Sequence, residues 1–197
     1  MISKDIFSIW FDEEGKMPEL VRHCLETQKI DGYTHRLITL EDLPTDNKYV
    51  KECLESAHRP AIKWCKLSDY MRAYTLFNDG GIYLDADVEV LPNRDFDNLL
   101  DNEMFAGLYR QGNIGSTVLA SIPNEEFYKD WLEYVETNFR GDDDCIPQTS
   151  YEYLTAHAKG VFTLYPSEYF YPYDHKYHKL EITDNTVSIH YFMRSWA

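Results

Sequence analysis

The order of elements predicted at the amino terminus constrains the fold of this chain more than any other feature. Residues 5–11 form a run rich in Ile, Phe and Trp that predicts a buried strand, and residues 19–28 carry apolar side chains at helical spacing. Residues 33–40 then alternate in polarity as a second strand. Strand, helix and strand in this order predict a βαβ unit, which implies a parallel sheet with helices on its faces. We therefore expect an α/β fold whose ligands bind at the carboxyl ends of the strands.

The rest of the chain continues this pattern of helices and strands. Pro60 favours a helix start, and residues 61–77 keep apolar side chains near core spacing until the turn-forming NDGG. Further strands are predicted at residues 104–109, 161–165 and 186–191, and further helices at residues 125–139 and 148–157. The sequence shows no linker or internal repeat, so we expect residues 1–197 to form one domain.

Charge and composition exclude several kinds of partner. The formal net charge of −15 opposes binding to nucleic acid, which requires clustered Lys and Arg, and it disfavours broad adhesion to an anionic membrane, although peripheral membrane contact stays open. No stretch approaches the ~20 apolar residues of a membrane span, and the amino terminus lacks a secretory signal, so we expect a cytoplasmic protein. The cysteines form no CxxC pair and are predicted to be reduced packing thiols: Cys24, Cys53, Cys65 and Cys145.

Two acidic residues interrupt the most strand-like run of the chain, GGIYLDADVEVLP at residues 80–92. The apolar residues occupy alternate positions, whereas Asp85 and Asp87 share the other parity, so both are expected on one face of a half-buried strand. Two residues along a strand span roughly 6.6 Å, which lets both carboxylates approach one cation from the same side. Because the chain is acidic, an anionic ligand such as a nucleotide would need a bridging cation of this kind.

The helix before this run adds a second pair of charges. Asp69 and Arg72 are three residues apart and therefore share a helix face. Taken alone, they are typical of a surface ion pair worth about 0.2–0.5 kcal/mol. Their place directly before an acidic strand also fits a binding site.

Residues 66–93, KLSDYMRAYTLFNDGGIYLDADVEVLPN, resemble the DXD-containing sugar-binding-region glycosyltransferases. This family includes fungal initiating mannosyltransferases and bacterial capsular and lipopolysaccharide enzymes, and it is similar to the clostridial glucosylating toxins. Its pattern is Ser-Asp with an Arg three residues after the Asp, then Gly-Gly-x-Tyr-x-Asp-x-Asp, an apolar stretch and Pro. The matching residues are Ser68, Asp69, Arg72, Gly80, Gly81, Tyr83, Asp85, Asp87 and Pro92. The resemblance implies a GT-A fold, which is a Rossmann-like mixed sheet flanked by helices.

Both ends of the chain extend the resemblance. ISKDIFSIWF, residues 2–11, resembles the opening strand of the family, with Ser3 in place of Pro and Phe7 in place of His. It keeps Trp10, which by resemblance stacks on the nucleobase of the donor, although a core aromatic residue fits the same position.

SIHYFMRSWA, residues 188–197, resembles the closing segment of the family. His190 is either a further metal ligand or a structural histidine at the end of a strand. Ser195 and Trp196 match a loop that closes over the donor diphosphate. The chain departs from the family in the middle, where many relatives carry Gly-Pro and this sequence has CIPQTSYEYLT, on what would be the acceptor side.

The resemblance also implies the chemistry of a metal-dependent hexosyltransferase. Asp87 would bind Mn²⁺ or Mg²⁺ directly, and Asp85 would reach the ion through water while contacting the ribose or the sugar. Asp69, Arg72 and Tyr83 would lie against the sugar and phosphates of a UDP- or GDP-hexose. The acceptor would be a glycan or lipid-linked saccharide in surface polysaccharide synthesis. Relatives retain the anomeric configuration, and no residue stands out as a covalent nucleophile, so a front-face displacement is expected in which donor phosphate helps to take the acceptor proton.

Two other functions fit parts of the sequence. IYLDADV also fits a haloacid-dehalogenase-type phosphatase, in which the first Asp is the nucleophile, and GDDDC at residues 141–145 resembles its late acidic motif. That strand lies deep in the chain, however, and no apolar strand leads into Asp142. A non-catalytic carbohydrate- or calcium-binding module could use the tyrosines of residues 165–178 as a stacking platform, but it would not need Asp69 and Arg72 beside a metal pair.

Overall fold

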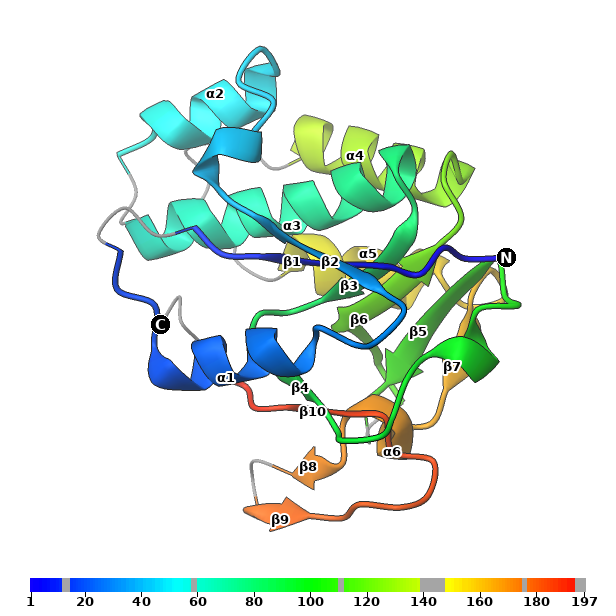
Figure 1. Ribbon diagram of the computed structural model, residues 1–197. Helices are drawn as coiled ribbons and strands as arrows, with labels where there is room; N and C mark the ends of the chain where they lie inside the picture. The colour runs from blue at the N-terminus through cyan, green and yellow to red at the C-terminus, as the bar shows by residue number, and fades with distance from the viewer. Residues whose placement is uncertain (12–14, 58–59, 110–111, 139–147, 175–176, 194–197) are drawn as a thin grey trace.

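A six-stranded mixed sheet forms the centre of the protein (Figure 1). The computed structural model describes residues 1–11, 15–57, 60–109, 112–138, 148–174 and 177–193. The strand order is β2 (Thr34–Ile38), β1 (Asp5–Ile9), β3 (Gly81–Leu84), β6 (Ile114–Ser121), β5 (Met104–Leu108) and β7 (Thr163–Tyr165). All neighbours are parallel except at β6, which runs antiparallel to both β3 and β5. The predicted α/β class and the mixed sheet are therefore confirmed.

Helices cover both faces of this sheet. Figure 1 shows α2 (Lys48–Glu55), α3 (Pro60–Asn78) and α4 (Glu126–Asn138) on one side, and α1 (Glu19–Thr27) and α6 (Ser167–Phe170) on the other. Helix α5 (Gln148–His157) contributes to the same buried cluster as α3 and α4. Two short 3₁₀ helices, η1 (Leu40–Asp42) and η2 (Asp97–Leu99), complete the described helical elements. The predicted βαβ unit is present, because α1 lies between the parallel strands β1 and β2.

Strand β3 is buried on both faces. Tyr83 points into the cluster under α2–α5, whereas Ile82 and Leu84 point into the opposite cluster, which α6 covers. All four residues of the strand are buried. The residues that directly follow such a strand lie at the edge of the apolar core. This is the end of the sheet at which ligands bind in α/β folds.

The predicted single strand across residues 82–90 is wrong. Strand β3 ends at Leu84, residues 85–87 form a turn, and β4 (Val88–Val90) begins after it. Because β3 is flanked by β1 and β6 and covered on both faces, a strand continuing through Asp85 and Asp87 would bury both carboxylates in apolar surroundings, which costs several kcal/mol for a charged group. The turn releases the two side chains from the core instead.

A small second sheet brings the end of the chain to this turn. Strand β4 leaves the main sheet and pairs antiparallel with β10 (Ser188–His190), in a register that places His190 opposite Val88. A further hairpin, β8 (Tyr173–Asp174) with β9 (Lys179–Leu180), lies beyond α6 (Figure 1). His190 thus lies beside the acidic turn, because β10 pairs with β4, the strand that directly follows the turn.

The cysteines agree with their predicted role where the structure describes them. Cys24 and Cys53 are buried and Cys65 is half-buried, and all three are free thiols. Burial raises the pKa of Cys24 to about 12, so this thiol stays protonated near neutral pH. Cys145 lies outside the described residues.

Membrane-spanning helices are not found in the described parts of the chain, where every helix is too short or too polar to cross a bilayer.

Candidate functional site

The acidic turn opens into a cleft of about 320 Å³ at the carboxyl ends of β1 and β3. The Asp85 carbonyl accepts a hydrogen bond from the Val88 N–H at 3.0 Å, which closes the turn, and the Asp85 N–H donates to the Thr117 carbonyl at 2.9 Å. These bonds tie the turn to β4 on one side and to β6 on the other. The lining residues include Trp10, Trp64, Asp69, Arg72, Asp85, Asp87, Tyr109, Ser116, Thr117, His190 and Phe192.

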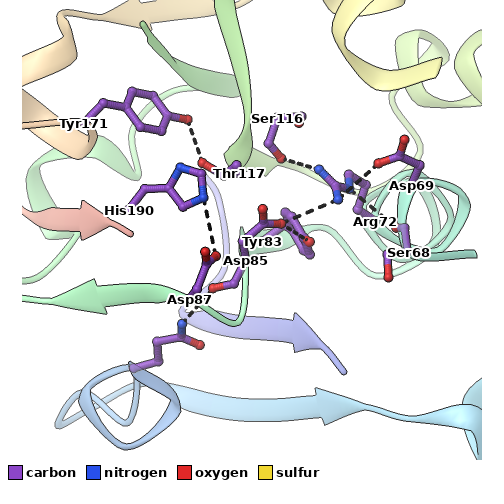
Figure 2. A network of polar contacts seen from close by, with 11 residues as sticks. Ser68, Asp69, Arg72, Tyr83, Asp85, Asp87, Ser116, Thr117, Tyr171 and His190 are labelled. Atoms are coloured by element: carbon purple, nitrogen blue, oxygen red, sulfur yellow. Dashed lines mark hydrogen bonds and ion pairs between the residues drawn. The ribbon is translucent and has the colours of Figure 1, made fainter. Parts of the chain in front are cut away.

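Asp85, Asp87 and His190 form a compact cluster in this cleft. One ligand atom from each side chain lies within 4.8 Å of the others, and Nε2 of His190 is 3.4 Å from a carboxylate oxygen of Asp87 (Figure 2). Two carboxylates and an imidazole suit Mn²⁺ or Mg²⁺ as oxygen-rich donors with one nitrogen. Nδ1 of His190 is buried and has no hydrogen-bond partner in the described residues, and the ring packs against Phe192, with ring centroids 4.0 Å apart. The residues present fit a divalent cation.

The two aspartates differ in their electrostatic surroundings. Burial raises the pKa of Asp85, and the Arg72 charge opposes this effect without cancelling it. Burial would also raise the pKa of Asp87, but the hydrogen bond and charge of His190 bring that pKa below its usual value. The backbone adds to this, because the Met193 N–H donates to the second carboxylate oxygen of Asp87 at 2.8 Å. Asp87 is therefore the more readily ionised of the pair.

Arg72 is the centre of a second, buried cluster. Its Nη2 lies 3.1 Å from an Asp69 carboxylate oxygen and 3.5 Å from Oδ1 of Asp85, and its Nη1 donates to the Ser116 carbonyl at 2.9 Å (Figure 2). The Arg72 and Asp69 side chains are only 8% and 5% exposed. The pair is thus not the surface ion pair that its spacing alone would suggest.

Tyr83 lies beneath the acids and links the two clusters. Its hydroxyl donates to Oδ1 of Asp85, and the Arg72 guanidinium lies 4.8 Å from the centre of its ring. The phenol is buried and comes from the middle of β3. Its contacts make it a support for Asp85 and Arg72.

Trp10 follows β1 and lines the cleft as a half-buried residue. It packs with a small apolar cluster that includes Val21 and Ala86, and its backbone N–H donates to the Ile38 carbonyl at 3.0 Å. The indole Nε1–H is buried without a hydrogen-bond partner in the described residues. Trp10 therefore presents an aromatic surface beside the turn, and it also contributes to packing.

Sequence reasoning missed several residues of the cleft. Tyr109 and Phe192 have ring centroids 5.9 Å apart, and Trp64 also lines the cleft. Phe192 has a φ of 53°, an uncommon backbone conformation for a residue other than Gly. The signal that could have drawn attention to Phe192 is its place between His190 and the Ser-Trp motif. The predicted residues Ser195 and Trp196 lie outside the described part of the chain.

Comparison with known families gives one sequence match. A family model described as capsular polysaccharide synthesis protein matches residues 1–133. This segment contains Trp10, Asp69, Arg72 and the acidic turn, whereas His190 lies outside it. No curated protein sequence matches the chain at a significant level.

Solved glycosyltransferase structures share the fold. A glycosyltransferase involved in the glycosylation of the major capsid of PBCV-1 aligns with a TM-score of 0.57 at 15% identity, over 97% of this chain and 96% of that one. The PaToxG glycosyltransferase gives a TM-score of 0.52 at 16% identity, over 81% and 71%. The apo form of GlyE from Streptococcus pneumoniae TIGR4 gives 0.51 at 13% identity, over 85% of this chain and 46% of the other. The chain thus has the GT-A type of fold predicted from its sequence.

Proposed function

The chain belongs to the capsular polysaccharide synthesis protein family, and from this we propose that it is a metal-dependent hexosyltransferase of surface polysaccharide synthesis. It would transfer a hexose from a UDP- or GDP-sugar to a glycan or lipid-linked saccharide. The observation that carries the proposal is the convergence of Asp85, Asp87 and His190 in one cleft with the buried Asp69–Arg72 pair. The glycosyltransferase fold and the family both support this enzyme class.

The Asp-Asp-His cluster is proposed to hold the cation of the donor complex. When bound, Mn²⁺ or Mg²⁺ would supply Lewis-acid stabilisation of the diphosphate leaving group. Asp87 would be the direct ligand, as in the family that the motif resembles, and His190 would add its Nε2, which lies 3.4 Å from the Asp87 carboxylate. Asp85 is held on its other side by Tyr83 and Arg72, which fits a role through water and toward the ribose or sugar. A chain of net charge −15 needs this neutralisation to receive a diphosphate.

The buried pair on α3 is proposed to position the donor sugar. Arg72 has its guanidinium engaged by Asp69, Asp85 and the Ser116 carbonyl, so it acts mainly by fixing the two carboxylates. Asp69 lines the cleft and is placed to accept hydrogen bonds from sugar hydroxyls. Fixed acceptors of this kind recognise a hexose by the directions of its hydroxyl groups.

The two ends of the cleft are proposed to receive different substrates. Trp10 would stack on the nucleobase, which leaves the neighbouring rings of Tyr109 and Phe192 for the acceptor saccharide. Aromatic rings bind the apolar faces of sugars while Tyr also offers a hydroxyl group. Ser195 and Trp196 stay a prediction for contacts to the diphosphate.

The proposed reaction retains the anomeric configuration. An acceptor hydroxyl oxygen forms a bond to the anomeric carbon on the face from which the diphosphate leaves with its bonding electron pair. The acceptor proton passes to a phosphate oxygen of the leaving group. Among the described cleft residues, Asp69 and Asp85 are held by Arg72, so neither is proposed as a covalent nucleophile.

Neither alternative function is favoured. In a haloacid-dehalogenase-type phosphatase Asp85 would be the nucleophile, but its carboxylate is engaged by Tyr83 and Arg72. The late acidic motif proposed for that enzyme, residues 141–145, lies outside the described residues. A binding module that lacks catalysis would not account for the capsular synthesis family.

A thermal-shift screen tests the proposal on the intact chain. Wild-type protein would be melted with UDP, GDP and their hexose conjugates, each with Mn²⁺ and with EDTA. Because a cation held by Asp85, Asp87 and His190 would neutralise the diphosphate, the melting temperature should rise most when nucleotide and Mn²⁺ are both present, by the amount that mass action sets. Acceptor-independent hydrolysis of the same nucleotide-sugar in Mn²⁺ gives the enzymatic readout. Shifts that are unchanged by EDTA would contradict the metal-dependent site.

A further inference from the structure

The acidic turn rests on one buried amide, the side chain of Gln28. This residue directly follows α1, and its N–H caps the helix by donating to the Cys24 carbonyl at 3.1 Å. Gln28 is 0% exposed. It lies 57 residues before Asp85 in sequence, yet its side chain reaches the backbone of the turn.

The amide nitrogen of Gln28 spans both ends of the turn. Nε2 donates to the Asp85 carbonyl at 3.1 Å and to the Val88 carbonyl at 2.8 Å. These two carbonyl groups bracket Ala86 and Asp87, the residues that the turn projects into the cleft. Both amide protons are therefore used to hold the peptide groups that set the direction of the Asp87 side chain.

The amide oxygen of Gln28 is held from the opposite side. Oε1 accepts a hydrogen bond from the Ser8 hydroxyl of β1 at 2.5 Å and faces Nε2 of His35 of β2 at 3.1 Å. Because a carbonyl oxygen only accepts, Nε2 of His35 must be the donor. Burial lowers the pKa of His35, which favours the neutral ring. A flipped amide would face its oxygen toward two carbonyl oxygens, so this network permits one orientation only.

We propose that Gln28 is a positioning residue for cation binding, which it controls by locking the backbone of the Asp85–Asp87 turn. The inference rests on the proposed function, because it concerns the same metal cluster. Gln28 is buried and is not among the described residues that line the cleft, so its proposed effect is indirect. Groups that orient metal ligands typically change metal affinity by 10–100-fold when they are removed, and here the orienting bonds act on the backbone that carries the ligands.

Thr27 supplies a matched control at the same helix end. Its hydroxyl donates to the Cys24 carbonyl at 2.7 Å and accepts a hydrogen bond from the Val90 N–H at 3.0 Å. Thr27 therefore also joins α1 to β4, but at the end of the strand away from the acids. Thr27→Val removes that link and leaves both Gln28 bonds to the turn in place.

The test compares Mn²⁺ affinity and fold in four proteins: wild type, Gln28→Asn, Gln28→Glu and Thr27→Val. Free Mn²⁺ is titrated by electron paramagnetic resonance, without nucleotide, and thermal melting is recorded in parallel. Gln28→Asn keeps the amide but is one methylene too short to span both carbonyl groups, and Gln28→Glu puts carboxylate oxygens against them. Both Gln28 variants should bind Mn²⁺ about tenfold or more weakly than wild type. Thr27→Val should melt earlier yet bind Mn²⁺ within about twofold of wild type.

Each outcome decides between the two proposals. Wild-type protein that binds no Mn²⁺ would overturn the metal site and, with it, the role of Gln28. A wild type that binds, together with a folded Gln28→Asn that binds equally well, would overturn only the Gln28 inference. Equal losses of affinity in Thr27→Val and Gln28→Asn would also overturn it. Any weakening of the contact between α1 and β4 would then be enough to lower the affinity for Mn²⁺.

A second measurement covers the case in which the Gln28 variants are too unstable to titrate. Hydrogen exchange of the Val88 N–H, followed in wild type and in Ser8→Ala, reports directly on the turn. Ser8→Ala removes one donor to the Gln28 oxygen, so the turn amide should exchange faster while the β1–β2 amides stay protected. Unchanged exchange at Val88 would contradict the proposed lock.

Discussion

The two halves of the candidate site differ in how their charged side chains are paired and buried. In the half formed by Asp69, Arg72 and Asp85, opposite charges are paired within the folded chain and are largely buried. In the half formed by Asp87 and His190, the Asp87 carboxylate and Nε2 of His190 lie 3.4 Å apart and both residues line the open cleft. The first half serves the fold as well as the site. The second half keeps binding capacity for a ligand, so mutations in the two halves should separate stability from activity.

The largest effect on activity is expected from Asp87→Asn. This change removes the charge of the proposed direct metal ligand but keeps an oxygen that can accept a hydrogen bond from the Met193 N–H. Sugar transfer and nucleotide-sugar hydrolysis should fall by roughly 10³-fold, the upper range for loss of one electrostatic contact to a developing charge. The melting temperature should stay near that of wild type.

Glu89→Gln is the control for this substitution. Glu89 lies two residues further along on β4 and accepts a hydrogen bond from the Tyr191 hydroxyl, and it is not part of the candidate metal cluster. Its activity should stay close to that of wild type. Wild-type turnover by Asp87→Asn at saturating Mn²⁺ would count against the assignment of the site.

Arg72→Leu, unlike Asp87→Asn, should strongly lower the free energy of unfolding. It leaves Asp69 and Asp85 without their cation in a buried place, and breaking a buried ion pair costs about 3–5 kcal/mol. Urea unfolding measures the free energy of unfolding. Arg36→Leu is the matched control, because Arg36 also pairs with two aspartates, Asp42 and Asp79, but is 54% exposed.

The control should lose no more than about 1 kcal/mol, since exposed ion pairs contribute little. Equal losses in the two arginine variants would show that the Arg72 cluster does not support the fold, and the contrast between the two halves of the site would disappear.

A smaller, selective effect is expected from Tyr109→Ala. The acceptor KM should rise about tenfold, because an aromatic contact is worth about 0.5–1.5 kcal/mol beyond the area that it buries. Acceptor-independent donor hydrolysis should change little, because Tyr109 belongs to neither half of the charged site. Tyr177→Ala is the control, since Tyr177 is 70% exposed and does not line the cleft. A parallel fall in transfer and hydrolysis would move Tyr109 from the acceptor side to the donor side.

Much of the fold could be predicted because local patterns agree with the tertiary structure. The predicted helix at residues 61–77 is α3 (Pro60–Asn78), and the predicted strand at residues 104–109 is β5 (Met104–Leu108). Strand β6 was missed because IGSTVLAS mixes small and polar residues without a clear period. Its strand conformation comes from pairing with β3 and β5.

The sequence could predict only the parts of the candidate site that consist of side chains. The sequence singled out Asp85 and Asp87 through the central motif, and His190 through the closing segment as either a metal ligand or a structural histidine; the structure brings the three side chains together. Sequence reasoning placed the two acids in a strand, however, because alternation alone does not reveal that β4 leaves the sheet to pair with β10. Two further sets of contacts involve backbone carbonyl groups: Arg72 donates to Ser116, and Gln28 donates to two carbonyl groups of the turn. The sequence pattern does not specify where these carbonyl groups lie.

The pairing of β4 with β10 also decides what a shortened chain could do. A fragment ending before residue 188 would contain the whole family match and both aspartates, but no imidazole would face Asp87. It would also expose the edge of β4, because β10 is its only partner strand among the described residues, and bare strand edges recruit other chains. Trimming from the carboxyl end should therefore remove one of the candidate cation ligands and promote self-association before the central sheet itself is disturbed.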